Sequence, residues 1–441
     1  MEELARESIS LLGKPARDSG GPRLGSFGAI FIMLKSALGA GLLNFPWAFD
    51  KAGGIHTAVT VELVCLVFLI SGLIILGYSS SISGQNTYQA VVRCVCGASI
   101  GKLCEICYIF NLFMISIAFL VIVGDQLQKL CVSIYELIIG LPEAEMPYHW
   151  YTDQRFTLSV LCVTLVFPLS ISKEIGIQKY TSVLGTFAAT YLTAAMIIKY
   201  HTMQDQETPV TPIYSSGLSS WASMFSVIPT ICFGFQCHES CIAIYSSMEN
   251  KKLSHWVFIS VVSMIICLVI YSLTGVYGYL TFGRRVAPDV LMSYTGDDLL
   301  MIVARLLFGI SIITIYPIVL LLGRSVIQDP LLNLRSKCNV VTESYEMYTR
   351  LVLTIAWIGI TLLVAVFVPD ISKVISVIGG IGAFFIFIFP GLCLVFAVQT
   401  EPISPYLRVI LTAWGVITLI CGAFIFGQST SIAIMQVLNK I

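Results

Sequence analysis

Long apolar stretches separated by short polar segments run through the whole 441-residue chain. A helix needs about 20 mostly apolar residues to cross the hydrocarbon core of a bilayer. Eleven segments meet this requirement, and we expect each of them to form a membrane-spanning helix. They are residues 27–49, 56–82, 102–130, 155–172, 178–200, 219–247, 256–282, 297–323, 347–368, 372–398 and 406–427.

The composition indicates that lipid is the solvent for much of the chain. It is 57% hydrophobic and 11% charged, whereas soluble domains carry about 25% charged residues. The formal net charge is zero, which argues against a nucleic-acid partner. The sequence contains no phosphate-binding P-loop and no H-E-x-x-H motif. We therefore expect a bilayer-embedded carrier rather than an enzyme or an ATP-driven pump.

The Lys and Arg residues between the apolar segments predict the orientation. With a cytosolic N-terminus, fifteen of these residues fall in cytosolic segments and eight in extracellular ones. Cytosolic loops carry the excess of positive charge in membrane proteins. The N-terminus is therefore predicted to be cytosolic, and an odd number of spans places the C-terminus outside.

Two of the predicted spans contain residues that interrupt a helix. The first has Gly39 and Gly41 in its middle and Pro46 just after them, and the sixth has Gly234 followed by Gln236 and His238. Glycine and proline both weaken a helix, and the freed backbone groups must avoid lipid. Broken helices five spans apart are typical of an inverted repeat with a mid-membrane binding site.

This repeat predicts the domain organisation of an all-α polytopic membrane protein. The predicted parts are a cytosolic tail (1–26), a first five-helix repeat (27–201), a second five-helix repeat (219–398) and an eleventh helix (406–427). Free N–H groups at half-helix ends suit a carboxylate, and free carbonyl groups suit a cation. An amino-acid zwitterion needs both kinds of end.

Three segments carry a resemblance to a known family: Lys35 to Phe49 with its Gly-Ala-Gly break, Phe233 to His238, and Tyr316 to Ser325. They resemble the sodium-coupled neutral amino acid transporters of the amino acid/auxin permease family. The resemblance implies a leucine-transporter-type fold with five plus five inverted helices and one extra. It also implies symport of amino acids such as glutamine and alanine, Na⁺ as coupling ion with no other metal or cofactor, and a plasma-membrane location. We expect a monomer.

The resemblance also implies a set of site residues. Substrate contacts would come from Ala37, Gly39, Ala40, Gly41, Phe233, Gly234, Gln236 and His238. The sodium ligands would be backbone carbonyls near Lys35 and Leu38 together with the hydroxyls of Ser311 and Thr314. Those hydroxyls are three residues apart and so share a helix face, and oxygen atoms are the ligands that hard cations prefer.

Lys35 departs from the family pattern, because several sodium-coupled members carry asparagine there. Three interpretations remain open. The ammonium group can extend to the cytosolic interface, it can pair with a carboxylate such as Glu62, Glu105, Asp125 or Glu239, or it can replace or weaken the sodium ion. The third interpretation would make transport sodium-independent.

Other polar residues within the spans also have two interpretations each. His238 can act as a pH sensor or only as a hydrogen-bonding neutral imidazole. Asp125 and Arg305 can form an extracellular gate or a static pair. Asn111 can face the substrate or join two helices. An amino-acid sensor without transport would use the same pocket, so it remains the alternative to a carrier.

Overall fold

The computed structural model describes residues 25–139, 153–171, 178–204, 224–296, 298–336, 343–368 and 370–438, and every regular element in this part is helical. The α-helices are α2 (Ser26–Ala37), α3 (Phe45–Lys51), α4 (Ile55–Ser83), α5 (Tyr88–Cys96), α6 (Ala98–Ile139), α7 (Gln154–Leu161), α8 (Phe167–Ile171), α9 (Gln178–Gln204), α11 (Ile228–Gly234), α12 (His238–Ser247), α13 (Leu253–Phe282), α14 (Leu299–Ser336), α15 (Glu343–Phe367), α16 (Ile371–Ala383), α17 (Phe389–Thr400) and α18 (Pro405–Leu438). Short 3-10 or π turns are η1 (Ala40–Asn44), η4 (Cys162–Val166), η5 (Phe225–Val227), η6 (Gly283–Arg285), η7 (Val290–Ser293) and η8 (Phe384–Ile388).

Each of the eleven predicted spans has a helical counterpart. In the described part of the chain, nine helices are long and apolar enough to cross a membrane, and a tenth span consists of two helices bent by 47°. The fifth predicted span is the 27-residue helix α9, which is not among these ten. The predicted tail, except for residues 25 and 26, lies outside the described residues, as do residues 219–223 of the sixth span and the last three residues of the chain.

The first predicted break is present where the glycines lie. Helix α2 ends at Ala37, and Leu38 is extended with ψ 98°. Gly39 is also extended, and the chain resumes helical structure in η1 and α3. The bent pair of 47° is this segment, so the break divides the first span near its middle.

The second break divides the sixth span. Helix α11 ends at Gly234, and α12 begins at His238. Between them Cys237 donates its backbone N–H to the carbonyl of Phe235 at 2.9 Å, so the chain makes a tight turn rather than a helical step. The sixth span is therefore two half-helices, as its glycine and polar residues predicted.

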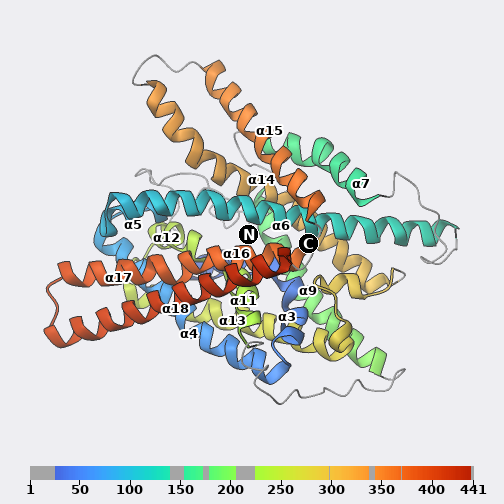
Figure 1. Ribbon diagram of the computed structural model, residues 1–441, viewed down its shortest axis with the longest axis horizontal. Coiled ribbons are helices and arrows are strands. Elements are labelled where there is room, and N and C mark those ends of the chain that lie inside the picture. The colour runs from blue at the N-terminus through green and yellow to red at the C-terminus, as the bar shows by residue number, and fades with distance from the viewer. Residues whose placement is uncertain are drawn as a thin grey trace.

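Long helices surround the two breaks and hold them in the interior. Helix α13 packs against α2, α3, α4 and α9, and α16 packs against α11. Helices α6 and α14 pack along each other, and α17 and α18 form an antiparallel pair (Figure 1). The broken segments are thus enclosed by continuous helices, which satisfies the requirement that irregular backbone avoid lipid.

Candidate functional site

The two breaks approach each other at their glycines. A Cβ atom added to Gly41 would lie only 2.7 Å from the Cα of Gly234 and 3.1 Å from its nitrogen. Both of these are backbone atoms that cannot rotate away. The close approach therefore requires glycine at position 41, and it brings residues that are far apart in the sequence into one site.

Tyr271 of α13 joins the ends of the two half-helices. Its hydroxyl donates towards the carbonyl of Ala37, the last residue of α2, at 2.8 Å and that of Gly234, the last residue of α11, at 2.9 Å. Its ring stacks on Phe45 with a centroid separation of 4.3 Å. Carbonyl groups at a helix end lack intrahelical partners, so this one hydroxyl satisfies two of them. The sequence analysis did not identify Tyr271.

A serine pair also links the two breaks. Ser36 Oγ and Ser240 Oγ lie 2.7 Å apart, which links the last turn of α2 to the first turn of α12. Ser36 is exposed, while Gly39, Gln236 and Glu239 are partly exposed, although all four flank breaks between packed helices. The break region therefore combines buried backbone with side chains that are at least partly exposed.

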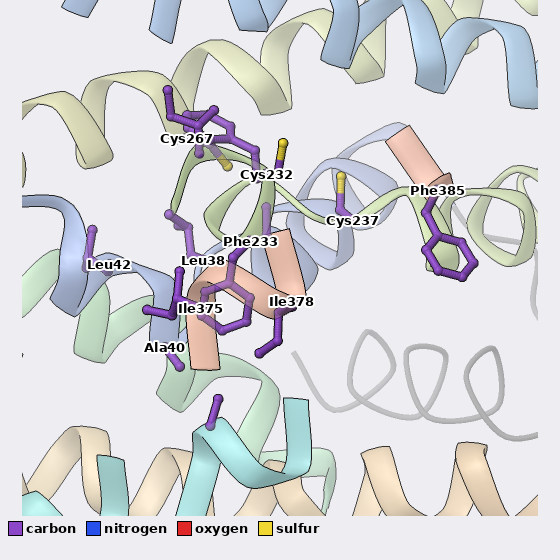
Figure 2. Packing of buried hydrophobic residues seen from close by; sticks show 14 of the residues in the cluster. Leu38, Ala40, Leu42, Cys232, Phe233, Cys237, Cys267, Ile375, Ile378 and Phe385 are labelled. Carbon is purple, nitrogen blue, oxygen red and sulfur yellow. The ribbon is translucent and has the colours of Figure 1, made fainter. Parts of the chain in front are cut away.

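An apolar wall lines the α11 side of the breaks. Figure 2 shows the Phe233 ring near Leu38 and Ala40 of the first break and near Ile375 and Ile378 of α16. All five residues are buried in one cluster. The predicted substrate residues Ala37, Ala40, Gly41, Phe233 and Gly234 thus lie together, and each is buried.

A polar cluster lies on the α12 side. Glu239 Oε1 accepts hydrogen bonds from Asn111 Nδ2 of α6 at 2.5 Å and from Gln236 Nε2 at 3.1 Å. Two of the predicted substrate residues, Asn111 and Gln236, therefore meet at a carboxylate that the predicted set did not include. Asn111 both joins two helices and lies beside the sixth-span break.

His238 turns towards α4 instead. Its Nε2 donates to the carbonyl of Leu69 at 3.0 Å, and the side chain is fully buried. A Cβ on Gly72 would lie 3.0 Å from the same nitrogen, so glycine on α4 makes room for the ring. The structure thus gives His238 a hydrogen bond between two helices.

The predicted sodium ligands Ser311 and Thr314 both lie on α14. Ser311 is buried, with its Oγ 3.3 Å from the position of a Cβ on Gly185 of α9. Thr314 donates its hydroxyl proton to the carbonyls of Ile310 and Ser311, both at 2.8 Å, so the oxygen lone pairs are what remains for a cation. Helix α9 packs against both α2 and α14.

The predicted gate residues, Asp125 and Arg305, contact two different segments. Arg305 is fully buried, and its Nη2 donates to the carbonyls of Leu291, Tyr294 and Thr295 in the connection between α13 and α14. Asp125 accepts from Gln154 Nε2 of α7 at 2.9 Å. Arg305 therefore anchors the connection, and a gating role for the two residues stays a prediction.

The α13–α14 connection also reaches the breaks through Asn44 at the end of η1. Asn44 Nδ2 donates to the carbonyl of Pro288 at 2.7 Å, and its Oδ1 accepts from Thr230 Oγ1 of α11 at 2.8 Å. The next residue, Asp289, accepts from Gln126 Nε2 of α6 at 2.5 Å. Burial raises the pKa of the Asp289 carboxyl to about 7. No local sequence pattern indicates this set of contacts, because they join four separate elements.

The chain is similar to amino acid transporters over almost its whole length. The family described as "Transmembrane amino acid transporter protein" matches residues 23–435. A Xenopus tropicalis protein, provisionally named sodium-coupled neutral amino acid transporter 8, is 64% identical over 440 residues, which is 100% of both chains. Solute carrier family 38 member 8 from Homo sapiens is 53% identical, covering 99% of this chain and 100% of its own. Sodium-coupled neutral amino acid transporter 7 from Danio rerio is 43% identical, covering 98% of this chain and 94% of its own.

A solved structure confirms the predicted fold class. The crystal structure of MhsT in complex with L-phenylalanine matches with a TM-score of 0.58 and 15% identity, covering 95% of this chain and 100% of that one. The fold is thus the leucine-transporter type, an all-α polytopic membrane protein of five plus five inverted helices and an eleventh. With the matched family covering residues 23–435, the chain belongs to the transmembrane amino acid transporters.

Proposed function

We propose that this protein is a secondary active carrier that moves neutral amino acids of the glutamine and alanine type by symport with sodium. One observation carries the proposal: two broken helices meet at Gly41 and Gly234 in a region that is partly exposed within the helical bundle. Backbone dipoles at such ends bind charged groups without a side-chain charge. The names of the relatives, which specify sodium-coupled neutral amino acid transporters, support the substrate class and the ion.

The two charged groups of the substrate would divide between the breaks. The N–H groups of Ala40 and Gly41, which begin the helical segment from η1 into α3, suit the substrate carboxylate. Carbonyl oxygens near Lys35 and Leu38 with Ser311 and Thr314 would supply hard oxygen ligands for Na⁺. Phe233 and its apolar neighbours would contact the aliphatic part of the substrate.

We further propose a monomer in the plasma membrane with a cytosolic N-terminus and an extracellular C-terminus. The excess of Lys and Arg in the predicted cytosolic segments, fifteen against eight, supports this orientation. The two repeats would cover residues 27–201 and 219–398, with 406–427 as the eleventh helix. The orientation is tested by placing a cysteine in either terminus of the protein and labelling it in intact cells.

Uptake into proteoliposomes that contain the purified full-length protein tests the function. We expect saturable uptake of glutamine and alanine that is driven by an inward sodium gradient and accelerated by unlabelled amino acid on the other side. Accelerated exchange distinguishes a carrier from a channel. Binding of amino acid with no uptake under any ion gradient would instead show a sensor.

Lys35 motivates the second candidate, a proton-coupled or sodium-independent carrier. Lys35 is partly buried and lies on the last turn of α2, one turn before Gly39. If it replaces the ion, wild-type uptake will be sodium-independent and Lys35→Asn will become sodium-dependent. Sodium-dependent uptake by the wild type rules this candidate out.

A further inference from the structure

Two cysteine side chains meet where the end of α5 packs against α17. Cys96 of α5 and Cys393 of α17 have their sulfur atoms 3.7 Å apart, although 297 residues separate them in the sequence. Both are free thiols, and Cys96 is partly exposed whereas Cys393 is fully buried. A disulfide bond is about 2.0 Å long, so the two sulfur atoms need to approach by only about 1.7 Å to form one.

The position of Cys96 at a helix end favours this approach. Cys96 is the last residue of α5, Gly97 follows it with φ 94°, and α6 begins at Ala98. Helix ends are held by fewer backbone hydrogen bonds than helix interiors. Cys96 therefore lies where the chain adjusts more easily than it does at Cys393, within α17.

The two thiols have the complementary properties of an oxidisable pair. The hydrogen bond with Cys393 lowers the pKa of the Cys96 thiol, and this effect outweighs the opposite effect of burial. The thiolate is the reactive form of cysteine. Redox-sensitive cysteines are accessible thiols of lowered pKa that lie beside a second cysteine, which resolves the first oxidation product. Cys96 has the properties of the first residue and Cys393 those of the second.

The surroundings of the pair indicate a reversible bond rather than a metal site. Among the residues that the structure describes, no group of three or more His, Cys, Asp or Glu side chains is arranged to hold a metal ion. The proposed orientation places the turn between α5 and α6 in the cytosol, where glutathione keeps cysteines reduced. The pair is therefore a dithiol at rest, which an oxidant in the cytosol would convert.

A bond between these residues would tie together helices that lie beside the second break. Helix α5 packs against α4, α6, α12 and α17, and α12 is the half-helix that follows the break (Figure 1). The bond would hold α5 at its present position on α17. Any step of transport that moves α5, or α12 with it, away from α17 would then be blocked.

We propose that Cys96 and Cys393 form a thiol switch that a peroxide closes into a disulfide and glutathione reopens, and that the closed form transports more slowly. The inference rests on the proposed transport function and orientation, and it adds regulation to them. Its site is separate from the substrate residues and from the sodium ligands.

The chemistry of the switch is balanced by the peroxide. The Cys96 thiolate attacks one oxygen of hydrogen peroxide, the O–O bond breaks, and a sulfenic acid and water form after proton uptake. The sulfur of Cys393 then attacks the sulfur of Cys96, the S–O bond breaks, and a second water leaves with the proton of Cys393. The two thiols are thus oxidised by two electrons, and the peroxide is reduced to water. Two molecules of glutathione reverse the change by thiol–disulfide exchange and become glutathione disulfide.

Peptide mass spectrometry tests the bond directly. The purified full-length protein is treated with hydrogen peroxide, its remaining thiols are alkylated, and it is digested with trypsin without reduction. Cys94 and Cys96 share one tryptic peptide, so the experiment is also done with Cys94→Ser. We expect a peptide pair joined through Cys96 and Cys393 in both proteins, and its loss after glutathione. Absence of this pair in both proteins would overturn the switch.

Thermal unfolding in detergent gives a second readout that needs no transport. The bond would close a loop of 297 residues, and closing a long loop lowers the entropy of the unfolded chain. We therefore expect peroxide to raise the melting temperature of the wild-type protein and to leave that of Cys96→Ser unchanged. An equal shift in both proteins would mean that peroxide acts elsewhere.

Uptake into proteoliposomes tests the effect of the bond on transport. We expect peroxide to remove most of the glutamine uptake of the wild-type protein and glutathione to restore it, whereas Cys96→Ser and Cys393→Ala should resist peroxide. Cys94→Ser is the matched control, because Cys94 is an exposed thiol on the same helix, and it should stay sensitive. Sensitivity that persists in Cys96→Ser, or that disappears in Cys94→Ser, overturns the switch. If Cys393→Ala fails to fold, Cys96→Ser still decides the matter.

These measurements separate failure of the switch from failure of the proposed function. If the bond forms and the melting temperature rises while uptake is unchanged, the protein remains a carrier and the regulation is overturned. If the reduced wild-type protein takes up no amino acid, the carrier function fails, and with it the control of transport, while the peptide pair and the melting temperature still show whether the two cysteines form a reversible bond.

Discussion

The hydroxyl of Tyr271 lies 2.8 Å from the carbonyl oxygen of Ala37, across 234 residues of sequence. The same hydroxyl lies 2.9 Å from the carbonyl of Gly234, so a single proton is shared between the ends of two half-helices. Each carbonyl is the C-terminal end of a helix dipole, where negative partial charge accumulates. Tyr271 therefore holds together two groups that would otherwise repel each other.

Replacing Tyr271 by Phe removes this link and little else. The ring can keep its stacking on Phe45, whereas two carbonyls lose their donor, so we expect the protein to be destabilised by about 1–3 kcal/mol. Transport should fall as well, because the relative position of the breaks is no longer fixed. Thermal unfolding in detergent and glutamine uptake in proteoliposomes measure the two effects.

Tyr277→Phe is the matched control for this change. Tyr277 lies on the same helix, and its ring contacts those of Tyr200 and His201 away from the breaks. It should keep both stability and uptake near wild-type values. If the two tyrosine variants behave alike, the hydroxyl of Tyr271 has no special role in the site.

Gly41→Ala should disrupt the contact between the breaks. The added methyl would lie 2.7 Å from the Cα of Gly234, and overpacking of this kind costs about 1–3 kcal/mol. We expect loss of uptake together with a lower melting temperature. Gly309→Ala on α14 is the control, because no atom lies within 4 Å of its added Cβ. Normal uptake by Gly41→Ala would show that the breaks separate more easily than the structure indicates.

Substitution of Asn44 should reduce transport more than substitution of Thr230, which shares only one of the two hydrogen bonds of Asn44. Asn44→Leu removes the bonds to Pro288 and Thr230, which connect the α13–α14 connection to both breaks. Thr230→Val removes only the second of these. We therefore expect a graded fall in the maximal rate of uptake, larger for Asn44→Leu than for Thr230→Val. An equal fall in the two variants, or the opposite order, would mean that the bond to Pro288 does not support transport.

Local sequence features predicted the breaks well, because a helix ends for reasons that lie in a few neighbouring residues. Gly39, Gly41 and Gly234 stand where the structure leaves helical geometry. The polar residues after Gly234 likewise indicated that this part of the sixth span faces protein rather than lipid. The approximate bounds of ten of the eleven predicted spans followed from apolar length alone.

Side-chain partners could not be predicted in the same way, because they depend on how each helix is rotated about its axis. His238 was placed with the substrate residues, yet its ring bonds to Leu69 on α4 in a space that Gly72 leaves open. Tyr271 reaches Ala37 across 234 residues of sequence, and Asn44 reaches Thr230 across 186. An apolar span of the kind that contains Tyr271 gives no local sign that one hydroxyl reaches two other helices.

Asp289 should make the stability of the protein depend on pH near neutrality. Burial raises the pKa of its carboxyl to about 7 in the folded protein, whereas the nearby Arg305 guanidinium acts in the opposite direction with a smaller effect. A group whose pKa is raised by folding binds more protons in the folded state. Stability therefore decreases as the pH rises from the ordinary pKa of an aspartate to about 7. Because the buried carboxylate loses its solvation, the folded protein should be less stable at pH 8 than at pH 6.

Thermal unfolding of the full-length protein in detergent tests this expectation. The melting temperature is measured from about pH 5.5 to about pH 8.5, an interval that brackets the raised pKa of Asp289. Asp289→Asn cannot ionise, and its amide can still pair with Gln126 after that side chain turns, because Gln126 Oε1 has no hydrogen bond to any described residue. The variant should therefore lose the decline in melting temperature that the wild-type protein shows towards high pH. A wild-type curve that is flat across this interval, or that rises with pH in parallel with the variant, would show that the Asp289 carboxyl does not control the pH dependence of stability.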